Sequence, residues 1–255
     1  MTFFRILWIP ALLGAVVPAP AAPRLALGDN ERLVYHVSCV LPSVGEIEVT
    51  AHAATDPTGA RLLRIDTTSR SRGLAHLILP FDVRAESLFD TRSGRLVWQG
   101  ESSETRGKSV AHSVRFDYKK DVAEYTVGNA VRELPMPPGY PTDLITSLLQ
   151  ARTWNMRPGD THDALVLFED DFYQLTIHAL GYETVTTPMG DFDTLVLEPR
   201  MEKTPPKGMF KRGSTVRVWI SRDNAHLPVR FQVDFKFGAG IATLVEYRPP
   251  AAEAP

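Results

Sequence analysis

The sequence predicts an all-β protein: a strongly curved antiparallel sheet or open barrel, with one short helix packed on or in it. Three observations lead to this fold class. Apolar and polar residues alternate with a period of two in many short segments, turn-forming residues separate these segments, and one segment alone has helical spacing. The alternation is clearest at Val229, Phe231, Val233 and Phe235, which polar side chains separate.

The same alternation recurs along the chain, and each segment that carries it is expected to be a strand. Asp, Asn, Gly, Ser and Lys residues lie between the segments, as is typical of turns. Short strands at this density favour a barrel or a sandwich. The expected strands cover residues 33–39, 46–51, 63–67, 96–99, 110–118, 123–127, 165–168, 173–180, 216–220, 229–236 and 241–247.

The only cysteine, Cys39, falls in the first of these segments. A chain with one cysteine cannot form an internal disulfide, so the core must stabilise the fold. Because Cys39 continues the alternation of Leu33, Tyr35 and Val37, we expect it to be a buried, small apolar residue rather than a reactive thiol.

The segment from about Thr142 to Trp154 is the one with helical spacing. Thr142 is expected to cap its first turn, and Arg152 suits its negative end. One face is strongly apolar, so the helix must bury that face on the sheet, where it would close a mouth or plug the concave side. This face consists of Leu144, Ile145, Leu148, Leu149 and Ala151.

Residues 1–21 resemble a secretory signal peptide. Arg5 supplies a positive start, residues 6–17 form an apolar run too short to span a membrane, and small residues precede an expected cleavage between Ala21 and Ala22. The mature chain is therefore expected in the periplasm, with no transmembrane segment after cleavage. Residues 22–248 are expected to form a single β-rich domain, and residues 249–255 a disordered tail.

Composition and motifs exclude several classes of function. The formal charge of the whole chain is -2. After removal of the signal segment, which contains Arg5, the chain has 27 basic and 30 acidic residues. This balance is not typical of a nucleic-acid-binding protein. The chain contains no recognisable catalytic, phosphate-binding, cofactor or zinc motif. Residues 169–171, Glu-Asp-Asp, lack the ligand spacing of a calcium loop, so we interpret them as a solvated turn rather than a metal site.

The polar cluster Arg222, Asp223, Asn224 and His226 is the strongest candidate for chemistry in the chain. It lies between two alternating segments, and Ser, Asp and Asn form turns through bonds to their own backbone. We therefore interpret residues 221–227 as a hairpin turn, with a catalytic Asp223–His226 pair as the alternative.

Four blocks of sequence together resemble a bacterial family, domain of unknown function (DUF) 3108. The resemblance covers residues 28 to 248 and implies an exported, mostly β envelope protein of Gram-negative bacteria. The family has no established catalytic residues, so none are transferred. The blocks are GDNERLVYHVSCVLPSVGEIEVTA, YPTDLITSLLQAR, TPMGDFDTLVLEP and VWISRDNAHLPVRFQV.

The leading functional hypothesis is a periplasmic binding or carrier protein without enzymatic activity, whose ligand is lipid-like or otherwise amphipathic. Apolar residues on both faces of some strands suggest that one face lines an enclosed pocket. The expected polar end is the basic loop from Lys203 to Arg212. The alternatives are an envelope assembly partner without a small ligand and an envelope hydrolase that uses Asp223 and His226. The residues expected at the ligand are Trp219, Phe210, Met209, Leu148 and Leu144.

Overall fold

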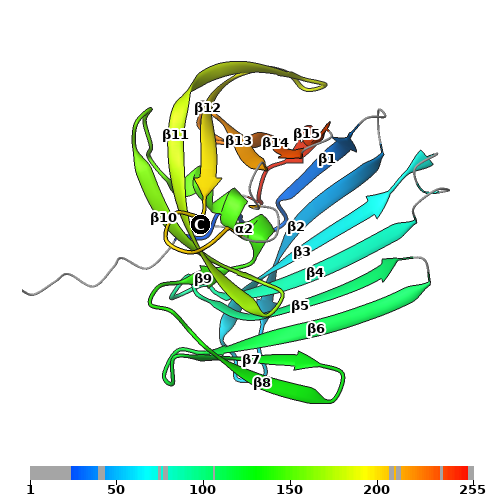
Figure 1. Ribbon diagram of the computed structural model, residues 1–255, viewed down its shortest axis with the longest axis vertical. Helices are drawn as coiled ribbons and strands as arrows, with labels where there is room; N and C mark the ends of the chain where they lie inside the picture. The colour runs from blue at the N-terminus through cyan, green and yellow to red at the C-terminus, as the bar shows by residue number, and fades with distance from the viewer. Residues whose placement is uncertain are drawn as a thin grey trace, which may run out of the picture.

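Within its described residues, the chain forms one sheet of 15 strands and a short helix (Figure 1). The strand order ends at β8 on one side and at β9 on the other, so the sheet is curved but not closed into a barrel. The predicted fold class is therefore confirmed. The computed structural model describes residues 24–39, 44–73, 76, 80–105, 107–206, 210, 214–235 and 238–251.

The first eight strands form a meander in which each strand pairs antiparallel with the next. Side chains at the turns fix this order locally: the carboxylate of Asp56, for example, accepts bonds from the backbone N–H groups of Thr58 and Ala60. The strands are β1 (Arg32–Ser38), β2 (Gly45–Thr55), β3 (Arg61–Ser71), β4 (Phe81–Asp90), β5 (Leu96–Thr105), β6 (Lys108–Asp117), β7 (Val122–Val127) and β8 (Ala130–Pro135).

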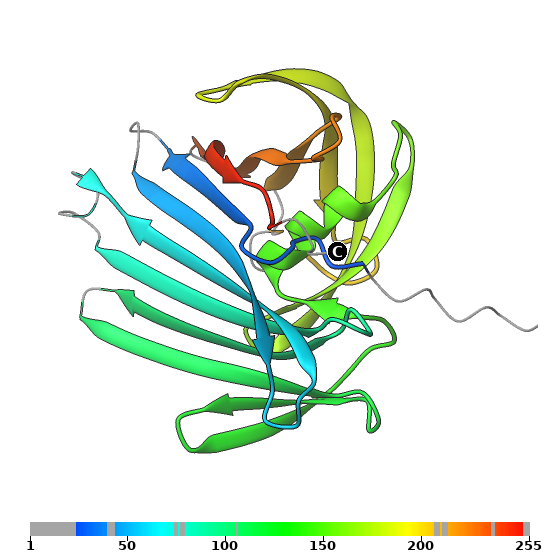
Figure 2. The ribbon, with the colours of Figure 1, turned by 180° about the vertical axis from the view of Figure 1, so that it is seen from behind.

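The rest of the chain runs back toward the first strand as a second meander, and its last strand, β15, pairs antiparallel with β1. The pair β9–β10 is parallel. Figure 2 shows the helix inside the curve that the two meanders enclose. The elements are β9 (Pro141–Thr142), α2 (Leu144–Gln150), the 3₁₀ helix η1 (Ala151–Thr153), β10 (Thr161–Phe168), β11 (Asp171–Thr187), β12 (Gly190–Arg200), β13 (Thr215–Ser221), β14 (Pro228–Phe235) and β15 (Gly238–Arg248).

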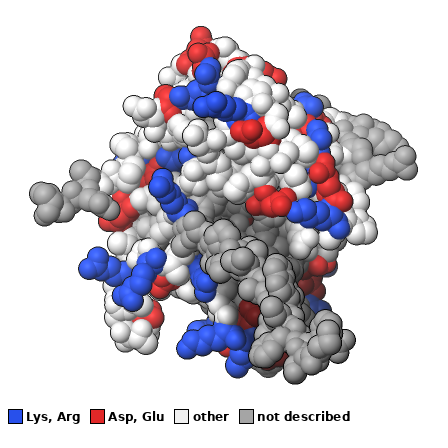
Figure 3. All heavy atoms as spheres, turned by 90° about the vertical axis from the view of Figure 1, so that its left-hand side faces the viewer, with Lys and Arg blue, Asp and Glu red and all other residues white. Residues whose placement is uncertain are grey.

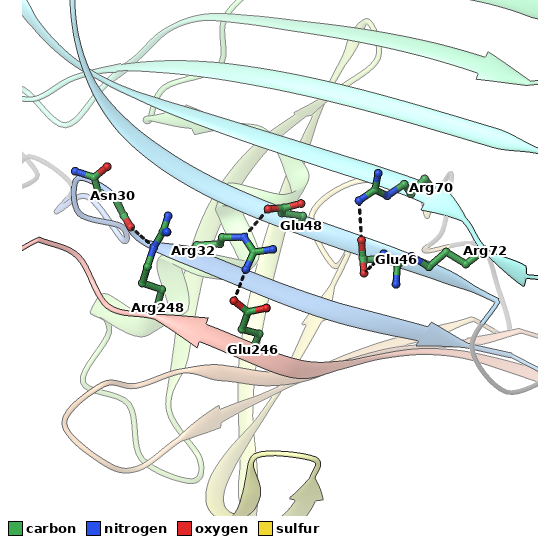
Figure 4. A network of polar contacts seen from close by, with 8 residues as sticks. All are labelled: Asn30, Arg32, Glu46, Glu48, Arg70, Arg72, Glu246 and Arg248. Carbon is green, nitrogen blue, oxygen red and sulfur yellow. Dashed lines mark hydrogen bonds and ion pairs between the residues drawn. The ribbon is translucent and has the colours of Figure 1, made fainter.

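A row of charged side chains crosses the seam between the meanders on the face away from α2 (Figure 4). Arg32 of β1 forms ion pairs with Glu48 of β2 and with Glu246 of β15. Farther along β2, Glu46 pairs with Arg70 and Arg72. Cross-strand pairs of opposite charge stabilise sheets, so this row reinforces the one place where the first and last strands meet.

The predicted helix is present but shorter than expected, because α2 spans Leu144–Gln150 and continues as one 3₁₀ turn to Thr153. The predicted cap at Thr142 is wrong. Thr142 lies in β9, paired with Val166, and Asp143 caps the helix by accepting the backbone N–H of Thr146. The prediction that the helix packs inside the curved sheet is confirmed.

Strands β11 and β12 extend beyond their neighbours as an arm that arches over β13 and β14 (Figure 1). A bulge between Ala179 and Gly181 lies where the pairing register of β11 shifts, and bulges bend and twist strands. Two contacts fix the arm to the strands below it. Glu183 accepts a bond from the Trp219 indole at 2.8 Å, and the Arg230 guanidinium donates to the Thr186 carbonyl at 3.4 Å.

The prediction that Cys39 is buried is wrong, because its side chain is exposed. The alternation of the sequence continues to position 39, but strand β1 ends at Ser38. The expected signal peptide and cleavage position lie outside the described residues, as do residues 252–255 of the expected tail. Of that tail, Ala251 donates its N–H to the carbonyl of Asp29 at 2.8 Å.

Candidate functional site

An apolar pocket of about 230 Å³ lies between α2 and the strands on both sides of the seam. Strands β1 and β2 supply one part of its wall and β13, β14 and β15 the other. Tyr35 supplies the only polar side-chain atom of the lining. The lining residues are Tyr35, Val37, Ile47, Val49, Leu144, Ile145, Leu148, Leu149, Val216, Phe231, Val233, Gly240 and Ala242.

Two of the five predicted ligand residues, Leu144 and Leu148, line this pocket. They lie four positions apart, which places them one above the other on a helix face. Both are only partly buried, whereas the neighbouring Leu149 is fully buried at 0% exposure. The helix thus offers four apolar side chains to the pocket, and one of them, Leu149, also anchors the helix in the core.

Trp219 lies on the opposite side of β13 from the pocket. Side chains alternate along a strand, so Val216 and Val218 share the pocket side, and Trp219 faces the β11–β12 arm, with 5% exposure. Both faces of β13 are packed, as the sequence indicated. The apolar pocket lies on the side of β13 that carries Val216 and Val218, and the β11–β12 arm lies on the side that carries Trp219.

Phe210 does not line the pocket either, although it packs against the buried cluster that includes Leu197 and Val218. Met209 lies outside the described residues, as do Lys207, Lys211 and Arg212 of the basic loop. Lys203 is ion-paired with Asp163 at 2.6 Å and lines a different pocket, on the other side of α2. Lys203, part of the basic loop expected at the polar end of the ligand site, therefore does not lie beside the apolar pocket.

Sequence reasoning did not single out Tyr35, whose hydroxyl oxygen is buried and has no hydrogen-bond partner among the described residues. Its ring packs against Phe231, with centroids 5.1 Å apart. Burial raises the pKa of the Tyr35 phenol, so the hydroxyl stays protonated. The alternation of β1 indicated that Tyr35 faces inward; the missing partner could be recognised only once every neighbour was in place.

Helix α2 is held at both ends by polar contacts that are shielded from solvent. At its start, the Asp143 carboxylate accepts a bond from the Ser87 hydroxyl of β4 at 2.8 Å. After its end, the Arg152 guanidinium forms an ion pair with Glu31 at 2.7 Å and donates to the carbonyls of Ala26 and Ala225. The Glu31 side chain is only 2% exposed, and that of Arg152 10%. These contacts hold the helix against both meanders.

The polar cluster between β13 and β14 is a turn, as predicted. One oxygen of the Asp223 carboxylate accepts bonds from the Ser221 hydroxyl and from the backbone N–H groups of Ala225 and His226. The His226 ring instead contacts the carbonyl of Arg152 through Nδ1, at 3.2 Å. The carboxylate thus bonds the backbone of His226 and not its imidazole, and the turn supports the end of the helix.

Glu169 and Asp170 form the turn between β10 and β11, with Glu169 at a φ of 54°, and Asp171 is the first residue of β11. Asp170 forms an ion pair with Arg132 of the edge strand β8. No group of three or more His, Cys, Asp or Glu residues in the described part of the chain is arranged to hold a metal ion.

The charged side chains on the face drawn in Figure 3 are of both signs and are interspersed. None of the helices in the described ranges is both long and apolar enough to span a bilayer.

Comparison with solved structures gives one useful likeness. A β-barrel-like DUF1849 protein from Brucella abortus matches with a TM-score of 0.55 at 9% identity, over 90% of this chain and 100% of that one. At this identity the likeness shows the fold alone.

Two further structures match with lower scores, which carry no argument. One is a candidate exported protein with a YmcC-like fold from Bacteroides fragilis, with TM-score 0.36, 12% identity, and 89% of this chain and 100% of that one covered. The other is a candidate lipoprotein from Parabacteroides distasonis, with TM-score 0.33, 12% identity, and 88% and 99% covered.

The search of curated proteins gave no match. Residues 34–245 match the model of a family described as protein of unknown function (DUF3108). This match covers most of the chain and agrees with the four sequence blocks. Three of the blocks lie on strands or the helix that line the apolar pocket, and TPMGDFDTLVLEP lies on β12, outside it. The chain belongs to the DUF3108 family.

Proposed function

We propose that this is an exported cell-envelope protein that binds the apolar part of a lipid-like, amphipathic molecule in the pocket beneath α2. The observation that carries the proposal is the pocket itself, which is bounded by apolar side chains from α2 and from both meanders. Ligand pockets are typically concave and mostly apolar, with few polar groups that fix orientation.

The size and chemistry of the pocket restrict the ligand. Its volume of about 230 Å³ lies below the roughly 300–1,000 Å³ typical of sites that enclose a whole small molecule. One acyl segment fits this description better than a complete phospholipid. No charged side chain lines the pocket, so an ionic head group would stay outside. Tyr35 is the one lining residue with a polar side chain, and its hydroxyl oxygen is itself buried.

Export is supported by the sequence of residues 1–21, with cleavage between Ala21 and Ala22 and a periplasmic location. N-terminal sequencing of protein recovered from the periplasm tests this part. An intact Met1 in a membrane pellet would contradict it.

The binding experiment is a titration of purified protein with a fluorescent fatty acid, together with mass spectrometry for lipid that co-purifies. Ala242→Phe introduces a large ring from the β15 wall of the pocket, and we expect it to abolish saturable binding. Thr243→Phe is the matched control, because Thr243 is the adjacent residue on the other face of β15, opposite His36 of β1.

Equal binding by wild type and Ala242→Phe would show that the probe does not use this pocket. No saturable binding by the wild type would remove the ligand from the proposal. The envelope-assembly alternative would then be the better hypothesis. The edge strand β8, where Val131 is 64% exposed, would be the surface to test first.

A further inference from the structure

A pocket of about 220 Å³ adjoins the polar turn between β13 and β14. The segment that follows α2, residues 151–157, forms one side of it, and β11, β12 and β13 form the other. Three basic side chains, Arg157, Arg222 and His226, line this pocket, and no acidic side chain does. We call it the basic pocket. It shares no lining residue with the apolar pocket, so the proposed lipid binding does not account for it.

The two arginines of the basic pocket keep their charge. Neither guanidinium group forms an ion pair with a residue in the described part of the chain. Arg222 instead stacks on the ring of Tyr182, 4.0 Å from its centroid. Stacking of this kind holds a guanidinium in place without neutralising it. Both positive charges therefore remain available to an anion.

The carboxylates near this pocket bind other donors. Asp160 accepts the backbone N–H of Arg157 at 2.7 Å. Asp223 accepts one hydroxyl and two backbone N–H groups of its own turn, and Asp193 accepts a threonine hydroxyl of β11. None of these three carboxylates lines the pocket, so the charged groups in its wall are all basic.

His226 can add a third donor. Its Nδ1 lies 3.2 Å from the carbonyl oxygen of Arg152, which can only accept a hydrogen bond, so Nδ1 carries a proton. The other ring nitrogen, Nε2, has no partner among the residues that the structure describes. In the imidazolium form Nε2 also donates, and the ring then contributes a positive charge to the pocket.

The remaining wall of the basic pocket is apolar and narrows the ligand class. It includes Leu195, Leu197 and Ile220, which are 8%, 2% and 5% exposed. Guanidinium groups match the paired oxygens of phosphates and carboxylates, and two like charges favour a doubly charged anion over a singly charged one. A phosphate monoester carries close to two negative charges at neutral pH. It also leaves one position for an organic group, which the apolar wall would cover.

We propose that the basic pocket binds the phosphate group of an organic phosphate between Arg157 and Arg222. A free phosphate monoester and the head group of a lipid such as phosphatidic acid share this chemistry. The assignment does not rest on lipid binding in the apolar pocket, because the two pockets have separate linings.

The test is NMR titration of 15N-labelled protein with inorganic phosphate and with acetate, at neutral pH and constant ionic strength. The Nε–H signals of the two arginines are assigned by comparison with Arg157→Gln and Arg222→Gln. We expect phosphate to shift both signals saturably, and Arg222→Gln to weaken its affinity about tenfold or more, because a charge-assisted hydrogen bond is lost. Arg200→Gln is the matched control. It removes the same charge from β12, where Arg200 pairs with Glu198, and should leave the affinity unchanged.

Four outcomes would overturn the proposal. They are no saturable shift with phosphate, equal phosphate affinity in wild type and Arg222→Gln, acetate affinity equal to that of phosphate, and an equal loss in Arg200→Gln. The last would show attraction to the overall charge of the protein instead of to this pocket. Arg157→Gln is the second variant if Arg222→Gln fails to fold, with near-UV circular dichroism as the check.

Sedimentation with vesicles distinguishes the two sources of the phosphate group. Wild type and Arg222→Gln are mixed with phosphatidylcholine vesicles that contain or lack phosphatidic acid. Retention of wild type alone, on the phosphatidic acid vesicles only, would assign the pocket to a lipid head group. Phosphate binding in the NMR titration without such retention would assign it to a free phosphate monoester. Either result supports the phosphate site.

Discussion

Helix α2 presents two faces to two pockets of different chemistry. Leu144 and Leu148 line the apolar pocket at the seam of the sheet, whereas Ser147 and Gln150 line the pocket on the other side of the helix, beside β10. In an ordinary amphipathic helix, one of these faces would contact the core and the other bulk water. Here both faces contact protein, so the polar face of this helix does not identify the solvent-exposed surface.

The largest effect is expected from a charge placed at the most deeply buried position of the helix. Leu149→Asp places a carboxylate at a position with 0% exposure. It loses about 2–5 kcal/mol of apolar packing and adds the cost of an unpaired buried charge. We expect thermal unfolding to show severe destabilisation or no folded protein. Leu148→Asp should cost less, because Leu148 is only partly buried; equal midpoints for the two variants would contradict this difference in burial.

A smaller but still large effect is expected from loss of the ion pair between Arg152, which follows the helix, and Glu31. Arg152→Met leaves Glu31 buried without its partner, which typically costs about 3–5 kcal/mol. The double variant Glu31→Leu, Arg152→Met should recover much of this loss, because it removes both charges. Chemical denaturation of the two variants measures the difference. If the single variant were as stable as wild type, the helix would not depend on this pair.

The smallest effect concerns pH and should arise on the polar side only. Burial lowers the pKa of His162, so the folded state holds fewer protons than the unfolded state at mildly acidic pH. Stability from this group is therefore complete above the unfolded pKa of about 6.5 and falls as the pH drops toward the lowered value. His162→Gln should make the thermal midpoint less dependent on pH between these two pKa values. An unchanged pH profile would show that His162 is not shielded.

The sequence predicted most of the strands, because a period of two is a local property that each segment shows without reference to the others. Strands β4, β8, β9 and β12 were not predicted. Residues 221–227 are a second example: Asp223 bonds to the backbone of its own turn, so the turn could be recognised within seven residues. The helix was predicted for the same reason, although its cap was placed one residue early because β9 takes Thr142 into the sheet.

Pairing between distant segments was not predictable in the same way. Trp219 is an apolar side chain on an apolar strand. This pattern is compatible both with a pocket wall and with a position beneath another layer of the protein. The choice depends on the bulge in β11 and on the path of the arm, which brings Glu183 to the indole. Cys39 was placed wrongly for a related reason, since pairing with β2 and β15 ends before it.

By itself, the sequence determined the class of fold, the positions of most strands and of the turns between them, and the apolar face of the helix, because short-range periodicity encodes all three. Tertiary structure decided which faces of the helix meet a cavity. The seam between β1 and β15 brings together residues about 200 positions apart in the chain, such as Tyr35 and Leu244. Only this pairing creates the apolar pocket, and only the packing of α2 against β10 leaves Gln150 buried without a partner.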